Sequence, residues 1–384
     1  MSMDKKIYLD NASTTPVDEK VMEAMKPFFE EKFGNPSSLH SFGQEARVAI
    51  DESREKIADY LNCDPKEVVF TGSATEANNI MIKGVIEADD NPHVITTSIE
   101  HDAVLETVKE SGADYTVLDV DKDGFIDLEE LKRVINEETV LVTVMYANNE
   151  IGTIQPIKEI ADLIRKINEK RDKRIYLHTD AAQAAGYLNC DVDELGVDGL
   201  TISGHKIYGP KGIGVLFKKR NVKVEPIIFG GGQEDGIRSG TYNTPLIVGM
   251  GKAVQLLNTE KRKEETKELR DYLVEEVLKI EGASLNGPKE DRLPNNANFS
   301  FEGVEGESIV MILDQKGIAT STGSACSSKS LKASHVLRAI GLGDLEAHSS
   351  LRVSVGRKTT REDVDRFLKV LPAVIERLRE ISGR

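Results

Sequence analysis

The amino-acid sequence predicts an α/β protein, with a mostly parallel sheet in a large domain and a smaller α+β domain after it. The first observation behind this prediction is that short apolar, β-branched runs alternate with helical stretches from about residue 64 to 218. Runs that are apolar on both faces and joined by helices are typical of parallel sheets covered on both sides. The second observation is a change after about residue 257, where a charged helix replaces the alternation.

Seven runs are predicted to form the strands of the large domain. In chain order they are VVF (68–70), VIT (94–96), YTVLDV (115–120), LVTVMY (141–146), RIYLHTD (174–180), GLTIS (199–203) and GVLF (214–217). Helical patterns fall between them at 75–88, 102–111, 127–136 and 156–170. The order of the strands within the sheet does not follow from these patterns.

The last part of the chain predicts the smaller domain. A charged helix is expected near 260–282, and an amphipathic helix over 360–381, where only Pro372 interrupts the spacing of apolar residues. We expect the large domain to span residues 15–257, and the small domain to combine 1–14 with 258–384. Because no long linker separates the two domains, a ligand-binding cleft is expected where they meet.

Composition and charge restrict the possible functions. The chain has 384 residues, enough for a large buried core, and its 50 basic and 65 acidic residues leave a formal net charge of −15. This charge repels phosphate backbones and anionic lipid surfaces, so neither nucleic acid nor a membrane is an expected partner. No apolar run reaches the roughly 18 residues of a membrane span, and the first residues lack the apolar core of a signal peptide. We therefore expect a cytoplasmic protein.

The three cysteines have no CxxC spacing, which argues against a disulfide framework and against a structural zinc site. Cys63 and Cys190 could pack among apolar neighbours. Cys326 lies instead among small, hydroxyl-rich residues (320–330), where we expect an accessible thiol.

One acidic segment has the residue spacing of a metal site. Residues 119–130, DVDKDGFIDLEE, match the spacing of a calcium-binding EF-hand loop. An EF-hand loop follows a helix, whereas the residues that enter this one, 115–118, have the pattern of a strand. We therefore predict an acidic strand-to-helix turn with Gly124 at its tight point, and no metal. A calcium-regulated binding protein is the alternative that rests on this segment alone.

A lysine and an aspartate follow neighbouring predicted strands. Lys206 comes soon after GLTIS and Asp180 ends RIYLHTD, so an amine and a carboxylate reach the same sheet edge. The segment TGSATEANN (71–79) opens a helix with small hydroxylated residues, so its N–H groups can face an anion. Pyridoxal phosphate needs a lysine for its aldehyde, an acid for its ring nitrogen and a cradle for its phosphate. The sequence therefore predicts a pyridoxal-phosphate site.

Three further polar residues fit the same cofactor. His101 follows a predicted strand and could stack on a flat ring and act as an acid or base. Asn149, after LVTVMY, and Gln183, three residues past Asp180, could hydrogen-bond to an oxygen of the cofactor or substrate. Taken alone, each of these residues also fits a structural role.

With these residues identified, the sequence resembles the cysteine desulfurases of the NifS/IscS type, which belong to the aspartate-aminotransferase-like group of pyridoxal-phosphate enzymes. The matching motifs are YLDNASTTP (8–16), FGNPSSLH (33–40), TGSATEANN (71–79), EHDAV (100–104), NNEIGTIQPI (148–157), HTDAAQ (178–183), SGHKIYGPKGIG (203–214), GGGQEDGIRSGT (230–241), STGSACSS (321–328) and SSLRVSVGR (349–357). The resemblance implies pyridoxal-phosphate fold type I and a homodimer.

The resemblance also implies a role for each motif residue. Lys206 would carry the cofactor aldehyde as a Schiff base, Asp180 would pair with the ring nitrogen, and His101 would stack on the ring. Arg352 would hold the substrate carboxylate, and Cys326 would be the nucleophile. The residues implied around the cofactor are Asn149 and Gln183 at its border, Ala74, Thr75, Ser203 and His205 around the phosphate, and Thr241 from the second subunit, with Asn149 also next to the substrate.

The implied reaction converts L-cysteine to L-alanine. Lys206 would remove the α-proton and Cys326 would take the sulfur as a persulfide, for transfer to an acceptor such as an iron–sulfur scaffold protein. The chain departs from the family twice: Gly72 and Ser73 are exchanged relative to the usual TSGATE, and the chain ends soon after its last helix, where scaffold-dedicated members have a longer tail. An aminotransferase or a selenocysteine lyase of the same fold is the enzymatic alternative.

Overall fold

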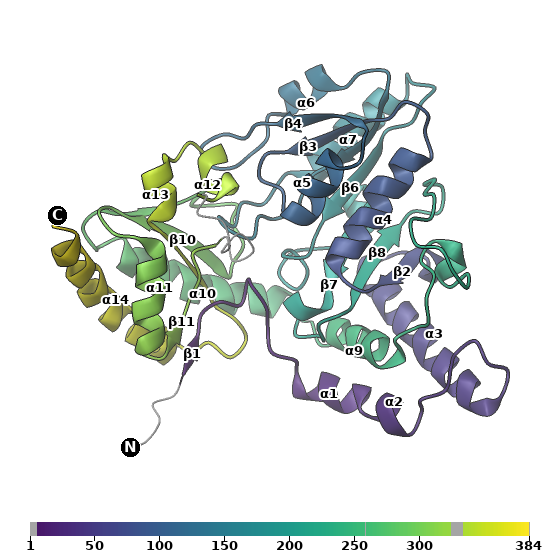
Figure 1. Cartoon of the computed structure of the whole chain (residues 1–384), viewed down its shortest axis with the longest axis horizontal. Helices are drawn as coiled ribbons and strands as arrows, with labels where there is room; N and C mark the ends of the chain where they lie inside the picture. The colour runs from purple at the N-terminus through teal and green to yellow at the C-terminus, as the bar shows by residue number, and fades with distance from the viewer. Residues whose placement is uncertain (1–5, 258, 324–332, 384) are drawn as a thin grey trace.

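The computed structural model describes residues 6–257, 259–323 and 333–383, and its strands form separate groups (Figure 1). The largest group is a seven-stranded sheet built from the first two-thirds of the chain. A three-stranded sheet and a two-stranded pair belong to the part that contains both ends of the chain. The site described below lies where these two parts meet.

The seven-stranded sheet is mostly parallel, which confirms the prediction. Its strands are β2 (Val68–Thr71), β3 (His93–Thr97), β4 (Asp114–Leu118), β5 (Thr139–Thr143), β6 (Tyr176–Asp180), β7 (Gly199–Ser203) and β8 (Gly214–Lys218), in the order β2-β8-β7-β6-β5-β3-β4. Each of the seven predicted runs overlaps one of these strands. Only β8 runs antiparallel to its neighbours β2 and β7. The connection 204–213 contains no helix beyond the short turn η2 (Gly204–Lys206), so it returns the chain without the crossover that a parallel neighbour needs.

Helices cover both faces of this sheet. They are α3 (Ser41–Leu61), α4 (Ala74–Glu87), α5 (Asp102–Lys109), α6 (Leu128–Val134), α7 (Ile157–Asn168), α8 (Val192–Leu195) and α9 (Thr244–Gln255), preceded by α1 (Glu19–Met25) and α2 (Pro27–Glu30) and accompanied by the short helices η1 (Pro65–Glu67) and η3 (Glu234–Gly236). Adjacent residues of β5 show the two-sided burial. Leu141 belongs to the core that contains Met81 of α4, whereas Val142 belongs to the core that contains Ile160 of α7.

The three-stranded sheet forms a second layer with its own core. Its strands are β9 (Ala283–Leu285), β10 (Asn296–Phe301) and β12 (Ser350–Ser354), in the antiparallel order β12-β10-β9, and β1 (Ile7–Tyr8) pairs with β11 (Ile318–Ala319). The helices of this part are α10 (Thr259–Val277), α11 (Gly306–Gln315), α12 (His335–Ala339), α13 (Asp344–His348) and α14 (Arg361–Ser382). Leu9 packs in the same core as Phe299 and Phe367, so the N-terminal segment joins the C-terminal part. The domain boundaries themselves stay a prediction.

The amphipathic helix predicted over 360–381 is confirmed: α14 runs from Arg361 to Ser382 and continues through Pro372. The helix begins with a capping box, in which the Thr360 hydroxyl accepts from the Asp363 N–H and the Asp363 carboxylate accepts from the Thr360 N–H. Phe367 and Leu371 point into the core of the small sheet.

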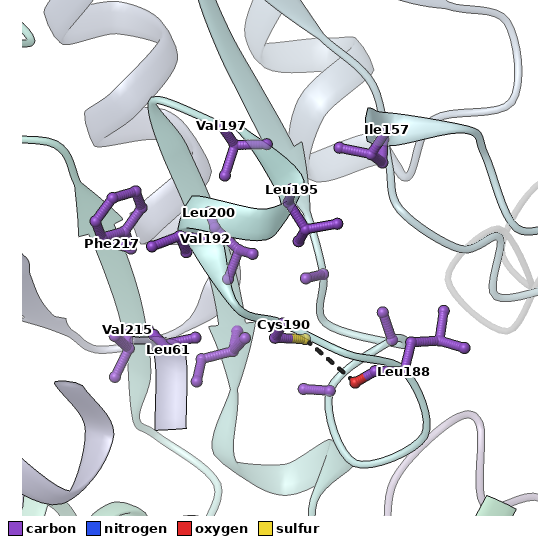
Figure 2. Packing of buried hydrophobic residues seen from close by; sticks show 14 of the residues in the cluster. Leu61, Ile157, Leu188, Cys190, Val192, Leu195, Val197, Leu200, Val215 and Phe217 are labelled. Atoms are coloured by element: carbon purple, nitrogen blue, oxygen red, sulfur yellow. Dashed lines mark hydrogen bonds between the residues drawn. The ribbon is translucent and has the colours of Figure 1, made fainter. Parts of the chain in front are cut away.

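Two cysteines are structural. Cys190 is 2% exposed and packs with Leu195, Leu200 and Phe217, and its thiol donates to the Leu188 carbonyl at 3.8 Å (Figure 2). Burial raises the pKa of the Cys190 thiol to about 12, and burial likewise raises the pKa of the half-buried Cys63 to about 12. Neither thiol is therefore a thiolate near pH 7.

None of the helices in the described part of the chain is long and apolar enough to cross a membrane.

Candidate active site

A cavity of about 470 Å³ opens at the carboxyl ends of β6 and β7. Most of the residues singled out in the sequence line it: Ala74, Thr75, His101, Asn149, Asp180, Gln183, Ser203, His205, Lys206 and Arg352. Cys326 lies outside the described residues, in the segment 324–332. Gly323 and His335, near the two ends of that segment, both line the cavity.

Lys206 and Asp180 enter the cavity from neighbouring parallel strands. Asp180 is the last residue of β6 and lies in register with Thr201 of β7. Past the end of β7, the turn η2 carries Lys206, whose Nζ donates to the carbonyl oxygens of Ala12 at 2.5 Å and Ser13 at 2.9 Å. The segment that follows β1 therefore holds the amine in the cavity.

The Asp180 carboxylate is 7% exposed and accepts two hydrogen bonds. Its Oδ1 accepts from the Ala182 N–H at 2.9 Å and its Oδ2 accepts from Asn78 Nδ2 at 2.7 Å. These two donors fix the plane of the carboxylate and satisfy part of its need for solvation.

The start of α4 forms the third wall of the cavity. Ser73 is its N-cap, and the Ser73 hydroxyl accepts from the Glu76 N–H at 3.1 Å. Ala74 and Thr75 belong to the first turn, where backbone N–H groups have no acceptor within the helix and the helix dipole is positive. This end of the helix can accept an anion, and the sequence predicted a phosphate site at the same residues.

The exchange of Gly72 and Ser73 has a local explanation. The Gly72 N–H donates to Glu76 Oε2 at 3.1 Å, and a Cβ atom on Gly72 would lie only 2.8 Å from that oxygen. The other Glu76 oxygen accepts from Arg238 Nε at 2.6 Å. Glycine at position 72 therefore leaves room for the Glu76–Arg238 ion pair, and serine at position 73 caps the helix.

His101 is the N-cap residue of α5. Its Nδ1 accepts from the Ala103 N–H at 3.0 Å, so in the neutral ring the hydrogen is on Nε2. This contact orients the ring at the cavity wall.

Two other histidines near the cavity are neutral at pH 7. Burial lowers the pKa of His178 to about 4, and its ring lies between the hydroxyls of Thr143 and Thr201, at 2.8 and 3.1 Å. Burial, with the charges of Lys206 and Lys211, lowers the pKa of His205 to about 4. His205 therefore offers a neutral ring beside the anion site.

Arg352 of β12 forms the wall opposite the large sheet and is 2% exposed. Its Nη2 donates to Asp10 Oδ1 at 2.9 Å and to the Ser13 hydroxyl at 2.7 Å, and its Nη1 donates to the carbonyls of Asn149 at 2.9 Å and Gly323 at 3.2 Å. The guanidinium is thus held rigidly at the point where the N-terminal segment, the 148–157 segment and β12 meet.

Gln183 and Asn149 complete the polar lining that the sequence predicted. Gln183 Nε2 donates to the Ala12 carbonyl at 2.9 Å, so it shares that acceptor with Lys206. The Asn149 carbonyl accepts from Arg352 and from Asn296 Nδ2 at 3.0 Å.

Thr241 is not among the residues that line this cavity. It lies instead at a shallow hollow of about 340 Å³ together with Phe33, Pro36 and Tyr242. The contact predicted for Thr241 is with the cofactor of a second subunit, so it stays a prediction.

The sequence did not point to two buried carboxyl groups in the cavity wall. Glu100 Oε1 accepts from the Met145 N–H at 2.8 Å and the Thr97 hydroxyl at 2.9 Å, and burial raises the pKa of Glu100 to about 8. Burial also raises the pKa of Glu150, whose Oε2 accepts from the Ser334 hydroxyl at 2.6 Å. Both residues were inside recognised motifs, but only packing shows that they are buried.

The acidic segment 119–130 is a turn between β4 and α6, as predicted. Asp121 Oδ1 accepts from the N–H groups of Asp123 and Phe125, each at 2.9 Å, and Gly124 has a φ of +88°. No group of three or more His, Cys, Asp or Glu residues is arranged to hold a metal ion within the described ranges.

The cavity suits pyridoxal phosphate. A buried carboxylate, an amine and a helix N-terminus surround one space, and each offers the chemistry that one part of the cofactor requires: the ring nitrogen, the aldehyde and the phosphate. A fold in which adjacent parallel strands deliver such a set to one edge defines a pyridoxal-phosphate enzyme of fold type I.

Comparison with known proteins agrees with this class. The chain belongs to the aminotransferase class-V family, whose model matches residues 7–367. It is 50% identical over 388 residues to a cysteine desulfurase IscS of Dictyoglomus turgidum. This match covers 99% of this chain and 97% of the relative. It is also 50% identical over 382 residues to cysteine desulfurase IscS 1 of Archaeoglobus fulgidus, with 98% of each chain covered. The resemblance found in the sequence is therefore confirmed.

Solved structures confirm the fold. A NifS-like protein superposes with a TM-score of 0.91 at 37% identity, over 97% of this chain and 100% of that one. A NifS-like protein from Rickettsia africae gives a TM-score of 0.87 at 30% identity, with the same coverage. The predicted fold and the predicted cofactor class are those of this family.

Proposed function

We propose that the chain is a pyridoxal-phosphate-dependent cysteine desulfurase that converts L-cysteine to L-alanine and transfers the sulfur to Cys326. One observation carries the proposal: Lys206 and Asp180 enter the same cavity from adjacent strands, opposite the N-terminus of α4. The choice of reaction is supported by the 50% identity to cysteine desulfurases over nearly the whole chain.

Substrate binding is assigned to Arg352 and Asn149. A guanidinium binds a carboxylate strongly when its plane is fixed, and Asp10 and Ser13 fix the plane of Arg352. The same contacts keep the positive charge of Arg352 at the cavity wall before substrate arrives. Asn149 also lines the cavity, and its backbone carbonyl accepts from Arg352.

Proton transfer is assigned to Lys206 and His101. Pyridoxal phosphate supplies an aldehyde for the substrate amine and a ring that accepts electrons from Cα. In this chain, Lys206 would be the amine that takes the Cα proton, and the Asp180 carboxylate would accept a hydrogen bond from the ring nitrogen. His101 lines the cavity, and Nε2 is the ring nitrogen that carries the hydrogen in its neutral form.

Sulfur transfer is assigned to Cys326, in the segment outside the described residues. Its thiolate attacks the substrate sulfur, so an S–S bond forms on the enzyme, the substrate C–S bond breaks, and the bonding electrons stay on carbon, which is protonated to give alanine. The test is incubation of the holoenzyme with L-cysteine and a reductant, with alanine and sulfide measured together. Equal yields are expected.

The variant Cys326→Ser separates this reaction from that of an aminotransferase. It is expected to bind the cofactor normally, since the residues assigned to the cofactor are other residues of the chain, and to lose sulfide production. Mass spectrometry of the wild type after L-cysteine should find one extra sulfur on the peptide that contains Cys326. A variant that released sulfide at the wild-type rate would contradict the assignment.

We also propose that two copies form a homodimer through the surface around α2 and the start of α3. Phe29, Phe33, Leu39 and Phe42 expose 52 to 95% of their surface, which is unusual for apolar side chains on a monomer. Thr241 adjoins this surface at the hollow shared with Phe33. A second copy seated here would bring its own Thr241 toward a neighbouring site, as the family resemblance implies.

The remaining assignments are the sulfur acceptor and the location of the protein in the cell. The persulfide sulfur is expected to pass to an acceptor such as an iron–sulfur scaffold protein, in the cytoplasm. Transfer of labelled sulfur from the loaded enzyme to a purified scaffold protein would test the first assignment.

A further inference from the structure

Asn78 makes a contact in the site that the reaction does not yet explain. It is fully buried on α4, and its Nδ2 donates to Asp180 Oδ2 at 2.7 Å. The other Asp180 oxygen accepts from the Ala182 N–H at 2.9 Å. One side-chain amide and one backbone amide are therefore the donors that orient this carboxylate.

The orientation of the Asn78 amide is determined by chemistry. A carboxylate only accepts hydrogen bonds, so the amide must present its nitrogen to Asp180, and rotation by 180° would place two oxygen atoms against each other. The Asn78 oxygen then has no hydrogen-bond partner among the described residues, although it is buried. A buried unpaired oxygen destabilises the fold. The Asn78 side chain therefore makes its hydrogen bond to Asp180 at a cost in stability.

The position of Asn78 on α4 links it to the anion site. Asn78 follows Ala74 by four residues, so the two side chains lie on the same face of the helix. Ala74 is in the first turn, where the helix presents its N–H groups to the cavity, and Asn78 is one turn deeper, against Asp180. One rigid helix therefore touches both the predicted phosphate site and the Asp180 carboxylate.

We propose that Asn78 is a positioning residue for the cofactor: it holds the Asp180 carboxylate in the orientation that receives the ring N–H, in register with the phosphate site at the start of α4. The proposal rests on the proposed function, since it assumes that the cavity holds pyridoxal phosphate. It adds a residue that neither the motif spacing nor the composition of the lining identifies.

The test compares two ligands with the full-length chain freed of cofactor. Pyridoxal phosphate has the ring nitrogen, and its 1-deaza analogue has a carbon there, so the ratio of their dissociation constants reports the contact with Asp180 alone. The wild type is expected to bind pyridoxal phosphate more tightly than the analogue. Asn78→Leu is expected to reduce this ratio about tenfold, because the carboxylate loses one of its two donors.

Asn79→Leu is the matched control. Asn79 is the next residue of the same helix, and its Nδ2 donates to the Thr75 carbonyl at 2.9 Å, away from Asp180. This variant is expected to keep the wild-type ratio. A reduction of the ratio by the same factor in both variants would overturn the proposal, because it would reflect a general disturbance of α4.

The outcomes separate this inference from the proposed function. If the wild type bound neither ligand, or bound both equally, the proposed function itself would fail. If the wild type discriminated and Asn78→Leu kept the same ratio, only the inference about Asn78 would fail. If Asn78→Leu does not fold, Asn78→Ala replaces it in the same measurement, because alanine removes the amide without adding atoms. Loss of folding in both variants, by thermal unfolding, would make Asn78 a purely structural residue and overturn the proposal.

Discussion

Asp10 and Arg352, which are 342 positions apart in the sequence, form an ion pair of 2.9 Å at the wall of the active-site cavity. The Arg352 side chain is 2% exposed and that of Asp10 is 18% exposed. The pair joins the segment after β1 to β12, and it fixes the only described guanidinium that lines the cavity. The contact therefore ties the N-terminal segment to the residue proposed to bind the substrate carboxylate.

Asp10→Asn is expected to destabilise the protein by about 2 kcal/mol, because the buried guanidinium loses its charged partner and keeps only neutral acceptors. Urea unfolding monitored by circular dichroism measures the change. Asp51→Asn is the control, since Asp51 forms an exposed pair with Arg47 and should cost less than about 1 kcal/mol. Equal losses in the two variants would show that burial of the Asp10 pair has no energetic consequence.

Arg352→Lys is expected to raise the KM for L-cysteine about tenfold or more and to change kcat less. Lysine keeps the charge but has no planar fork, so it cannot contact Asp10, the Asn149 carbonyl and a substrate carboxylate together. Steady-state kinetics of alanine formation measure both constants. Arg338→Lys, an exposed residue of α12, is the control and should leave both unchanged. An unchanged KM in Arg352→Lys would exclude a role for Arg352 in substrate binding.

Lys206→Ala is expected to abolish covalent attachment of the cofactor. Borohydride treatment of the wild-type holoenzyme should fix the cofactor on the peptide that contains Lys206, because only this lysine lines the cavity among the described residues. Peptide mass spectrometry locates the label. Lys211→Ala, which alters an exposed lysine of the same connection between β7 and β8, should be labelled at Lys206 like the wild type. A label on another lysine would contradict the assignment.

Glu100→Gln is expected to change how stability depends on pH. Because burial raises the pKa of Glu100 from 4.5 to about 8, the folded state binds one more proton than the unfolded state between these values. This group therefore stabilises the fold at low pH and loses its contribution as the pH rises, by at most about 1.4 kcal/mol per pH unit. Glutamine resembles the neutral acid and does not titrate.

Thermal unfolding at pH 5 and pH 8 tests this prediction. The Glu100→Gln variant is expected to resemble the wild type at pH 5 and to be the more stable protein at pH 8. The same difference between the two proteins at both pH values would show that Glu100 does not titrate in this range.

Leu39→Lys is expected to weaken the proposed dimer, because Leu39 is 95% exposed, belongs to the proposed contact surface and would be buried in the dimer. Light scattering at several concentrations measures the mass. Leu345→Lys, which alters a leucine of α13 that is 79% exposed, is the control and should not change the mass. A wild type that is monomeric at all concentrations would exclude the proposed dimer.

The sequence alone determined the parts of this protein that depend on local patterns. The parallel strands follow from apolar runs that are buried on both faces. Lys206 and Asp180 could be paired because each lies at or just past the carboxyl end of such a run, and the ends of parallel strands meet at one edge. The anion site follows from Ser73 and the first turn of one helix. Each motif that carries these features is only a few residues long, so the sequence shows it without a structure.

Only the tertiary structure decided what depends on distant segments. The antiparallel direction of β8, the burial of Glu100 and Glu150, the Asp10–Arg352 pair and the contact of Asn78 with Asp180 all arise when remote elements pack together. A residue type states which bonds a side chain can make, but its partner and its exposure to water depend on what the rest of the chain places beside it. Local motifs therefore determine which chemical groups the site contains, and tertiary packing determines their hydrogen-bond partners, their burial and their pKa values.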